Sequence, residues 1–147
     1  MLQASMQLIA TLSCAVFAGA AVYVNLVEHP ARMSCGTEAA INQWAPSYRR
    51  ATWMQAPLAL LGFLSAVIAW LAGASTAWLI GGVLLGLVIP VTLVVIMPTN
   101  KRLLSADLDR QSEEARKLLN RWNALHGIRT ALSIAALLFF LGAPAAY

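Results

Sequence analysis

The stretch PLALLGFLSAVIAWLAGASTAWLIGGVLLGLVIP, residues 57–90, contains no charged side chain. The small residues AGAST at 72–76 divide it into two apolar runs, which we place near 54–72 and 76–97. Each run has the length of about 17–25 residues that a helix needs to cross the hydrocarbon core of a membrane. Three glycines in the second run allow close approach of a neighbouring helix: Gly81, Gly82 and Gly86. The pattern predicts two membrane-spanning helices joined by a tight turn.

Two further apolar runs flank this hairpin, near 5–27 and 127–143. Of the 147 residues, 60% are hydrophobic and 11% are charged, whereas a soluble domain carries about 25% charged residues. No Lys or Arg precedes the first run, and a signal peptide has a basic segment there, so we expect a membrane span. We predict an all-α, four-helix transmembrane bundle that forms one integral membrane domain over residues 1–147.

The charged side chains lie on one side of this arrangement. All ten Lys and Arg and all six Asp and Glu residues fall in the polar segments 28–53 and 98–126 or at their borders. Four spans place both segments at the same membrane face, and Lys and Arg prefer the cytoplasmic face. We therefore expect cytoplasmic polar segments and both termini on the opposite side. The net charge of +4 then reflects topology, and we expect no nucleic-acid partner.

The segment SADLDRQSEEARKLLNRW, residues 105–122, precedes the fourth run and has an amphipathic pattern. Its apolar residues recur at intervals near 3.6, with charged residues between them. Ser105 is a candidate N-cap, followed by the acidic Asp107 and Asp109 in the first turn. We expect an additional amphipathic cytoplasmic helix, which either lies on the membrane surface or extends the fourth span.

The start of the fourth span, RWNALHGIRT at 121–130, concentrates polar and aromatic side chains. Trp122 lies four residues before His126 and Arg129 three residues after it, so the three share one helix face. The other spans bring further polar residues to the same end: Tyr23, Asn25, His29, Gln55, Asn100 and Lys101. Because exposure of polar groups to lipid is unfavourable, and because the first and fourth helices of an up-and-down bundle are neighbours, we predict that His29 and His126 line one cavity.

Two motifs carry a family resemblance: Pro98-Thr99-Asn100-x-x-Leu103 and Trp122-x-x-x-His126-x-x-Arg129-Thr130. With the four-span layout, which covers nearly the whole chain, they resemble the anthrone oxygenase-like family of small membrane proteins, much of which is classed as a domain of unknown function. The stretch VEHPAR at 27–32 is similar to bacterial members. The resemblance implies a bacterial inner-membrane protein and a cofactor-independent oxygenase that converts anthrones to anthraquinones.

The residues at this end suit such chemistry. His126 is the candidate base, because a histidine side chain has an ordinary pKa of about 6.5, near working pH. Arg129 or Lys101 can stabilise a developing oxyanion, and His29 completes the catalytic candidates. The polar and aromatic candidates for binding a planar, lipid-soluble aromatic substrate are Tyr23, Asn25, Gln55, Asn100, Lys101 and Trp122. We predict no cofactor and no metal for this reaction.

Two other interpretations stay open. His29 and His126 can serve as ligands of a haem or metal, with three methionines as soft copper ligands: Met33, Met54 and Met97. Alternatively, the protein is a non-enzymatic ligand-binding or accessory subunit whose amphipathic helix docks a partner. A homo-oligomer is also left open. Cys14 and Cys35 form no C-x-x-C motif, so we expect two free thiols.

Overall fold

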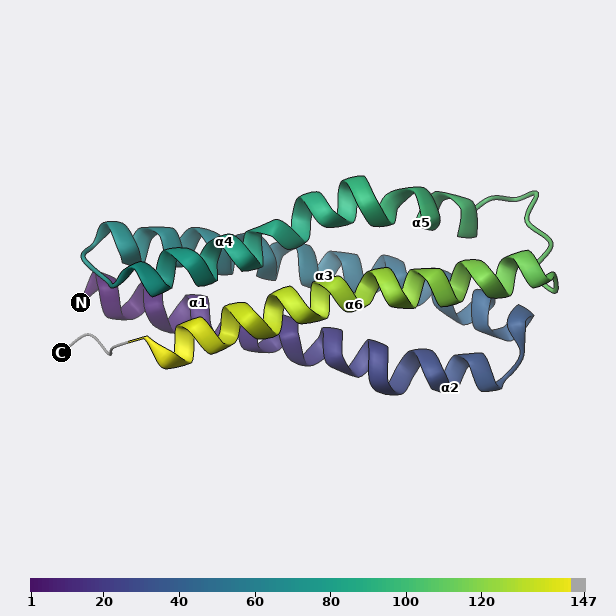
Figure 1. Ribbon diagram of the computed structural model, residues 1–147, viewed down its shortest axis with the longest axis horizontal. Helices are drawn as coiled ribbons and strands as arrows, with labels where there is room; N and C mark the ends of the chain where they lie inside the picture. Colours follow the sequence, from purple (N-terminus) through teal and green to yellow (C-terminus); the bar gives the residue numbers. More distant parts are fainter. Residues whose placement is uncertain (144–147) are drawn as a thin grey trace.

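The computed structural model describes residues 1–143, and these form helices joined by short turns, with no strand (Figure 1). Four helical segments are long and apolar enough to cross a membrane, so the predicted all-α, four-span membrane bundle is confirmed. The segments are α1 (Leu2–Tyr23) continued by the π-helix η1 (Val24–Glu28) and α2 (His29–Ser34); α3 (Thr37–Leu71); α4 (Thr76–Pro90) continued by the π-helix η2 (Val91–Ile96) and α5 (Met97–Leu103); and α6 (Glu113–Gly142). The expected position of the C-terminus, Tyr147, lies outside the described residues.

The four segments form a ring in which each contacts two neighbours. α1 packs against α3 and α6, and α4 packs against the same two helices. The first and fourth spans are therefore neighbours, as predicted. Figure 1 shows the start of α1, the α3–α4 turn and the end of α6 at one end of the bundle, and the loops at 35–36 and 104–112 at the other.

Close packing between the spans depends on small residues. A side chain at Gly81 would collide with the ring of Phe140 and approach the backbone oxygen of Ala136 on α6. A side chain at Gly82 would collide with Ala66 on α3. The predicted close approach at these glycines is confirmed, and it places α4 between its two neighbours. Such contact is important in a membrane, because an apolar side chain is as favourably placed in lipid as against another helix. Close packing must therefore hold the helices together.

The first polar segment is largely helical. α2 and α3 are separated only by residues 35–36, and Gly36 has a φ of 91°. This left-handed conformation is one that glycine adopts readily and other residues rarely adopt. The helix of the first span therefore continues well beyond its apolar run before the chain reverses direction.

The amphipathic segment is the first half of α6. Residues 113–126 continue directly into the fourth span, so of the two expected placements the structure has the extension of that span. The predicted N-cap at Ser105 is wrong. Ser112 caps α6 instead, because its Oγ accepts a hydrogen bond from the backbone N–H of Ala115 at 3.1 Å. The N-cap pattern at Ser105 falls in the turns that precede the helix.

Two helical segments widen into π-helical turns just before a proline. η1 ends two residues before Pro30, and η2 ends two residues before Pro98. A proline inside a helix cannot donate its backbone hydrogen bond, and helices respond by local distortion. The chain nevertheless remains helical through Pro30 to Ser34. Short π-helical turns inside helices are frequent at functional sites.

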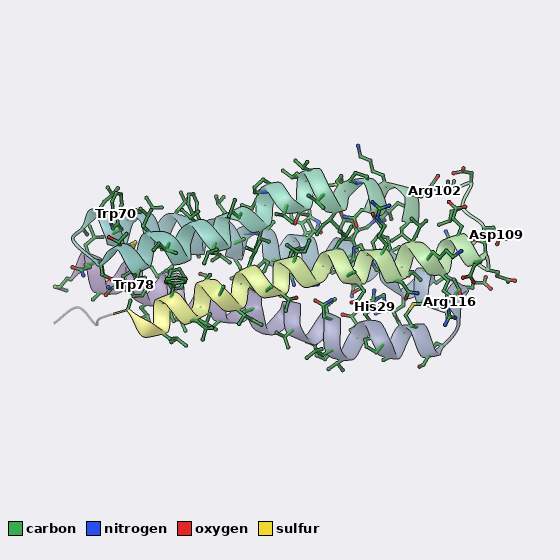
Figure 2. All side chains as sticks on the ribbon, viewed as in Figure 1. His29, Trp70, Trp78, Arg102, Asp109 and Arg116 are labelled. Carbon is green, nitrogen blue, oxygen red and sulfur yellow. The ribbon has the colours of Figure 1, made fainter. Side chains whose placement is uncertain are left out.

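Charged side chains gather at the loop end of the bundle. Figure 2 shows Arg102, Asp109 and Arg116 near this end, with Trp70 and Trp78 at the opposite end. Arg102 forms ion pairs with Asp107 at 3.0 Å and with Glu114 at 2.8 Å. The one-sided charge pattern of the sequence is thus a property of the folded bundle as well.

Candidate active site

Asn25 on η1 and His126 on α6 form the centre of a buried polar cluster. His126 is only 3% exposed, and its Nδ1 lies 2.9 Å from Oδ1 of Asn25. The amide nitrogen of Asn25 donates to the backbone oxygen of Asn123 at 2.9 Å and to its Oδ1 at 2.7 Å. Thr130 Oγ1 donates to Oδ1 of Asn25 at 2.5 Å. Two helices are therefore joined by a network in which Asn25 uses both ends of its amide.

This network fixes the tautomer of His126. Because the amide nitrogen of Asn25 faces two oxygens, its Oδ1 faces His126, and an amide oxygen can only accept a hydrogen bond. Nδ1 of His126 is therefore the donor. In a neutral imidazole the other nitrogen, Nε2, then carries a free lone pair. The arrangement leaves His126 with one nitrogen that can accept a proton.

Arg129 lies one helical turn after His126 and is held by α3. Its Nη2 donates to Oε1 of Gln55 at 2.6 Å, and its guanidinium carbon lies 5.4 Å from the centre of the Phe17 ring. Within residues 1–143, the ion pairs involve Arg32 and Arg102 rather than Arg129. A guanidinium group without a carboxylate partner in a partly dehydrated site can stabilise negative charge on a ligand.

The indole of Trp122 connects the two predicted histidines. Its ring centre lies 4.9 Å from that of His126 and 5.8 Å from that of His29. Trp44 meets it edge-on at 5.7 Å, and Tyr48 stacks on Trp44 at 5.1 Å. Figure 2 shows His29 between the ribbons of α2 and α6. The two histidines, which are far apart in the sequence, belong to one aromatic cluster.

Arg32 is part of this cluster, and the sequence analysis did not select it. Its side chain is 3% exposed, its guanidinium carbon lies 5.8 Å from the centre of the Trp122 ring, and its Nη2 lies 2.6 Å from Oε1 of Glu28. The same oxygen accepts hydrogen bonds from Gln43 at 2.8 Å and Ser47 at 2.6 Å. The four-residue spacing of Glu28 and Arg32 permits an ion pair, but it does not show that the pair faces the bundle interior.

Three spaces in the bundle share Gln55 as a lining residue. A groove of about 720 Å³ lies between α1–η1 and α3, a cavity of about 120 Å³ lies in the interior, and a cavity of about 20 Å³ lies beside His126. The smallest is lined by Val24, Arg32, Ser47, Tyr48, Ala51, Thr52, Gln55, Trp122, His126 and Arg129. The groove is lined by Ala20, Tyr23, Val24, Glu28, Gln43, Pro46, Ser47, Arg50, Ala51, Met54 and Gln55. Gln55 thus stands where an open groove meets the buried cluster.

The remaining predicted site residues lie at different positions. Tyr23 is exposed and lines the groove. Asn100 is buried on α5, and neither atom of its amide forms a hydrogen bond within the described residues. Lys101 is exposed, and within residues 1–143 it lines none of the three spaces. The structure therefore brings six of the predicted residues together in one cluster. The six are Asn25, His29, Gln55, Trp122, His126 and Arg129. Of these, Gln55, Trp122, His126 and Arg129 line the cavity beside His126. His29 contacts Trp122 but, within the described residues, lines none of the three spaces, so the structure does not bring both histidines to one cavity as predicted. Asn25 contacts His126 from outside the lining, and Tyr23, Asn100 and Lys101 lie apart from the cavity.

The metal and haem alternative draws on the same histidines. In the part of the chain that the structure describes, no three His, Cys, Asp or Glu side chains form a group that can hold a metal ion. Because Nδ1 of His126 is engaged by Asn25, Nε2 is the atom of that ring available to a ligand. Of the candidate copper ligands, Met54 lines the groove and Met97 lines the 120 Å³ cavity. The structure brings neither methionine to the cavity that His126 lines.

Comparison with known proteins bears on the part of the chain from α3 onwards. A family model described as anthrone oxygenase matches residues 44–139. This range contains Gln55, Trp122, His126 and Arg129, and it begins after Asn25. No curated protein and no solved structure gives a match to the chain. Since the family model covers more than half of the sequence and the structure has the four membrane spans of a small membrane protein, the chain belongs to the anthrone oxygenase family.

Proposed function

We propose that the protein is a membrane-embedded oxygenase that oxidises a lipid-soluble aromatic substrate of the anthrone, phenol or quinone-like class. The reaction is base-assisted and needs no bound cofactor. The observation that carries this proposal is the hydrogen bond between Nδ1 of His126 and Oδ1 of Asn25. It holds the imidazole in the tautomer whose Nε2 can remove a proton, beside a guanidinium group that has no carboxylate partner within the described residues.

The first step is the removal of a proton from an acidic C–H group of the substrate. In an anthrone this group is the methylene carbon opposite the carbonyl, and its deprotonation places negative charge on the carbonyl oxygen. His126 Nε2 accepts the proton, and general-base catalysis of this kind contributes typically 10²–10⁴-fold to a rate. Arg129 is the group that stabilises the resulting oxyanion, because a fixed cation in a dehydrated site favours charge that develops there.

Dioxygen is the co-substrate that completes the reaction. The electron-rich anion reduces O₂, and a C–O bond forms at the deprotonated carbon to give a hydroperoxide. Loss of water from the hydroperoxide leaves a second carbonyl group. One anthrone and one O₂ thus give one anthraquinone and one water, and the substrate itself supplies the electrons.

The groove between α1–η1 and α3 is the entrance that we assign to the substrate. Its volume of about 720 Å³ lies within the range of roughly 300–1,000 Å³ that is usual for small-molecule sites. Its mouth includes the exposed side chains of Tyr23 and Met54, so an apolar ring system can enter from the lipid. Gln55 lines both the groove and the cavity of His126, which supports a binding pose in which the ring lies in the groove with its methylene edge toward the candidate base.

We further propose that the loop end of the bundle faces the cytoplasm of a bacterial inner membrane, with both termini outside. The support is that the charged side chains gather at the loop end, because the positive-inside rule favours Lys and Arg on the cytoplasmic side. Figure 1 supports an even number of membrane crossings, because the start of α1 and the end of α6 lie at the same end of the bundle.

Oxygen uptake by the purified full-length protein tests the proposed function directly. We expect uptake with an anthrone as probe substrate, in detergent or lipid discs, above a protein-free control. His126→Gln should lower kcat by about 10²–10⁴-fold, while the matched control Asn120→Ala, an exposed position on α6, should keep wild-type activity. No uptake with any of several anthrones would show that the substrate class is wrong. Full activity of His126→Gln would show that the base is wrong.

A further inference from the structure

We propose that Arg32, Arg129 and His126 surround a binding site for one small anion. In the reaction proposed above, that anion is the superoxide formed when the substrate reduces dioxygen. The identity of the anion rests on the proposed function, whereas the site itself rests on the cavity, the burial and the hydrogen bonding of these residues. The site is the cavity of about 20 Å³ beside His126.

The size of this cavity restricts what it can hold. A water molecule needs roughly 10–15 Å³ of such space, so about 20 Å³ admits one monatomic or diatomic ligand and excludes an aromatic ring. The larger groove shares Gln55 with this cavity. A substrate in the groove and a small ligand in the cavity can therefore lie next to each other.

The charge around the cavity favours an anion. Two guanidinium groups, those of Arg32 and Arg129, line it, and the nearby carboxylate of Glu28 pairs with Arg32 alone. The Oε1 atom of Glu28 already accepts hydrogen bonds from Gln43 and Ser47. One positive charge in this region is therefore not matched by a carboxylate of the described residues.

The guanidinium groups also have unused donors. Nε and Nη1 of Arg32 and Nε of Arg129 are buried and donate no hydrogen bond within residues 1–143. An unsatisfied buried donor is unfavourable, most of all on a charged group. Arginine presents its donors in a planar fork that suits anions. A small anion in the cavity would supply the acceptor that these donors lack.

The assignment explains how the protein can assist the step that involves dioxygen. The substrate carbanion transfers one electron to neutral O₂, which gives a substrate radical and superoxide. The two combine to form the C–O bond of a peroxide anion, and this anion becomes the hydroperoxide when it takes the proton that His126 Nε2 accepted earlier. Arg32 and Arg129 interact more strongly with superoxide than with O₂, so they stabilise the charge that appears in this step.

Chloride binding tests the site without any turnover. Full-length protein in detergent is unfolded thermally in sodium chloride and in sodium gluconate of equal ionic strength, since gluconate is too large for the cavity. We expect chloride to raise the Tm of wild type and of Arg121→Gln, a matched control at an exposed position on α6. Arg32→Gln should lose this increase. A chloride effect of wild-type size in Arg32→Gln, or none in wild type, would overturn the proposal.

A second variant covers the case in which Arg32→Gln does not fold. Glu28→Gln combined with Arg32→Gln removes both members of the ion pair and keeps the local charge balanced. The double variant should also lose the chloride effect. If chloride still raises the Tm of the double variant, the proposed site is wrong.

Steady-state kinetics then connect the site to dioxygen. In Arg32→Lys we expect kcat/KM for O₂ to fall by about ten- to a hundredfold, the range for hydrogen bonds to charged groups, with KM for the anthrone little changed. In the double variant we expect the same fall in kcat/KM for O₂. Chloride binding through Arg32 without anthrone oxidation in wild type would refute the proposed function and leave the anion site standing. If wild type oxidises an anthrone but the variants keep their O₂ dependence and their chloride effect, the anion site is refuted and the proposed function stands.

Discussion

Oδ1 of Asn25 accepts a hydrogen bond from Nδ1 of His126 at 2.9 Å, although the two residues are 101 positions apart in the sequence. The family match at 44–139 contains His126 and begins after Asn25. The first helix therefore supplies the group that orients the candidate base, from a π-helical turn that the matched part of the chain does not include. His126 is also buried, so it belongs to the packed interior as well as to the site.

The tautomer of His126 can be observed without a substrate. The chain has only two histidines, so a ¹⁵N spectrum of histidine-labelled protein contains few signals. We expect Nδ1 of His126 to be protonated and Nε2 to be unprotonated in the neutral ring, because Oδ1 of Asn25 can only accept. In Asn25→Ala this preference should weaken. Protonation at Nε2 in wild type would contradict the assigned role of Asn25.

Loss of Asn25 should also slow turnover. Asn25→Ala removes the acceptor for His126 and the donor to Asn123, so we expect kcat to fall by about tenfold or more, with the 10²–10⁴-fold that a general base contributes as the upper limit. Oxygen uptake with an anthrone measures the effect, and Asn120→Ala is the exposed control. Wild-type kcat in a folded Asn25→Ala protein would show that the hydrogen bond has no role in turnover.

The charge of Arg129 can be neutralised by a substitution at its hydrogen-bond partner, Gln55. Gln55→Glu would place a carboxylate against the guanidinium, at the position where Oε1 of Gln55 now lies 2.6 Å from Nη2. We expect a folded protein whose kcat falls by at least about tenfold, because an ion pair in a dehydrated site competes with the oxyanion. Arg129→Lys should be impaired as well, since it keeps the charge and loses the planar fork. Undiminished uptake by both variants would remove Arg129 from the mechanism.

Reporter fusions test the proposed topology. We expect a reporter that is active only outside the cytoplasm to work when fused after Tyr147. A reporter that is active only in the cytoplasm should work when inserted in the loop at 104–112. The physical reason is the concentration of Lys and Arg at the loop end. Cytoplasmic activity of the fusion at Tyr147 would reverse the topology.

The close contact of α4 with α6 predicts the effect of a larger residue at Gly81. Gly81→Leu would force its side chain against Phe140 and the backbone of Ala136, so we expect the free energy of unfolding to fall by about 1–3 kcal/mol. Gly19→Ala is a matched control, since nothing lies within 4 Å of the added carbon. Thermal unfolding in one detergent compares the two. An unchanged Tm for Gly81→Leu would contradict the packing of these helices.

Absorption spectroscopy separates the oxygenase from the haem alternative. We expect the purified protein to show no haem band and to oxidise an anthrone without an added metal, because the reaction takes its electrons from the substrate. A haem band that disappears in His126→Gln would instead identify His126 as a haem ligand.

The sequence alone determined the features that depend on local pattern. Uninterrupted apolar runs such as 57–90 specify membrane-spanning helices, because backbone polar groups in lipid must be satisfied within the helix. The placement of Lys and Arg showed that the polar segments share one end. Helical spacing likewise put Trp122, His126 and Arg129 on one face, and the structure keeps these three together at the cavity.

Only the tertiary structure decided which residues of different helices meet. The sequence grouped Tyr23 with His126 and passed over Arg32, but the structure has Tyr23 exposed at the groove and Arg32 buried beside Trp122. The reason is that a π-helical turn, such as η1 between these two residues, changes the rotation of all side chains that follow it, and a single-helix pattern does not report that change. Contact across the bundle, as between Asn25 and His126, depends on how far each helix is rotated and shifted against its neighbour, and packing alone sets that register.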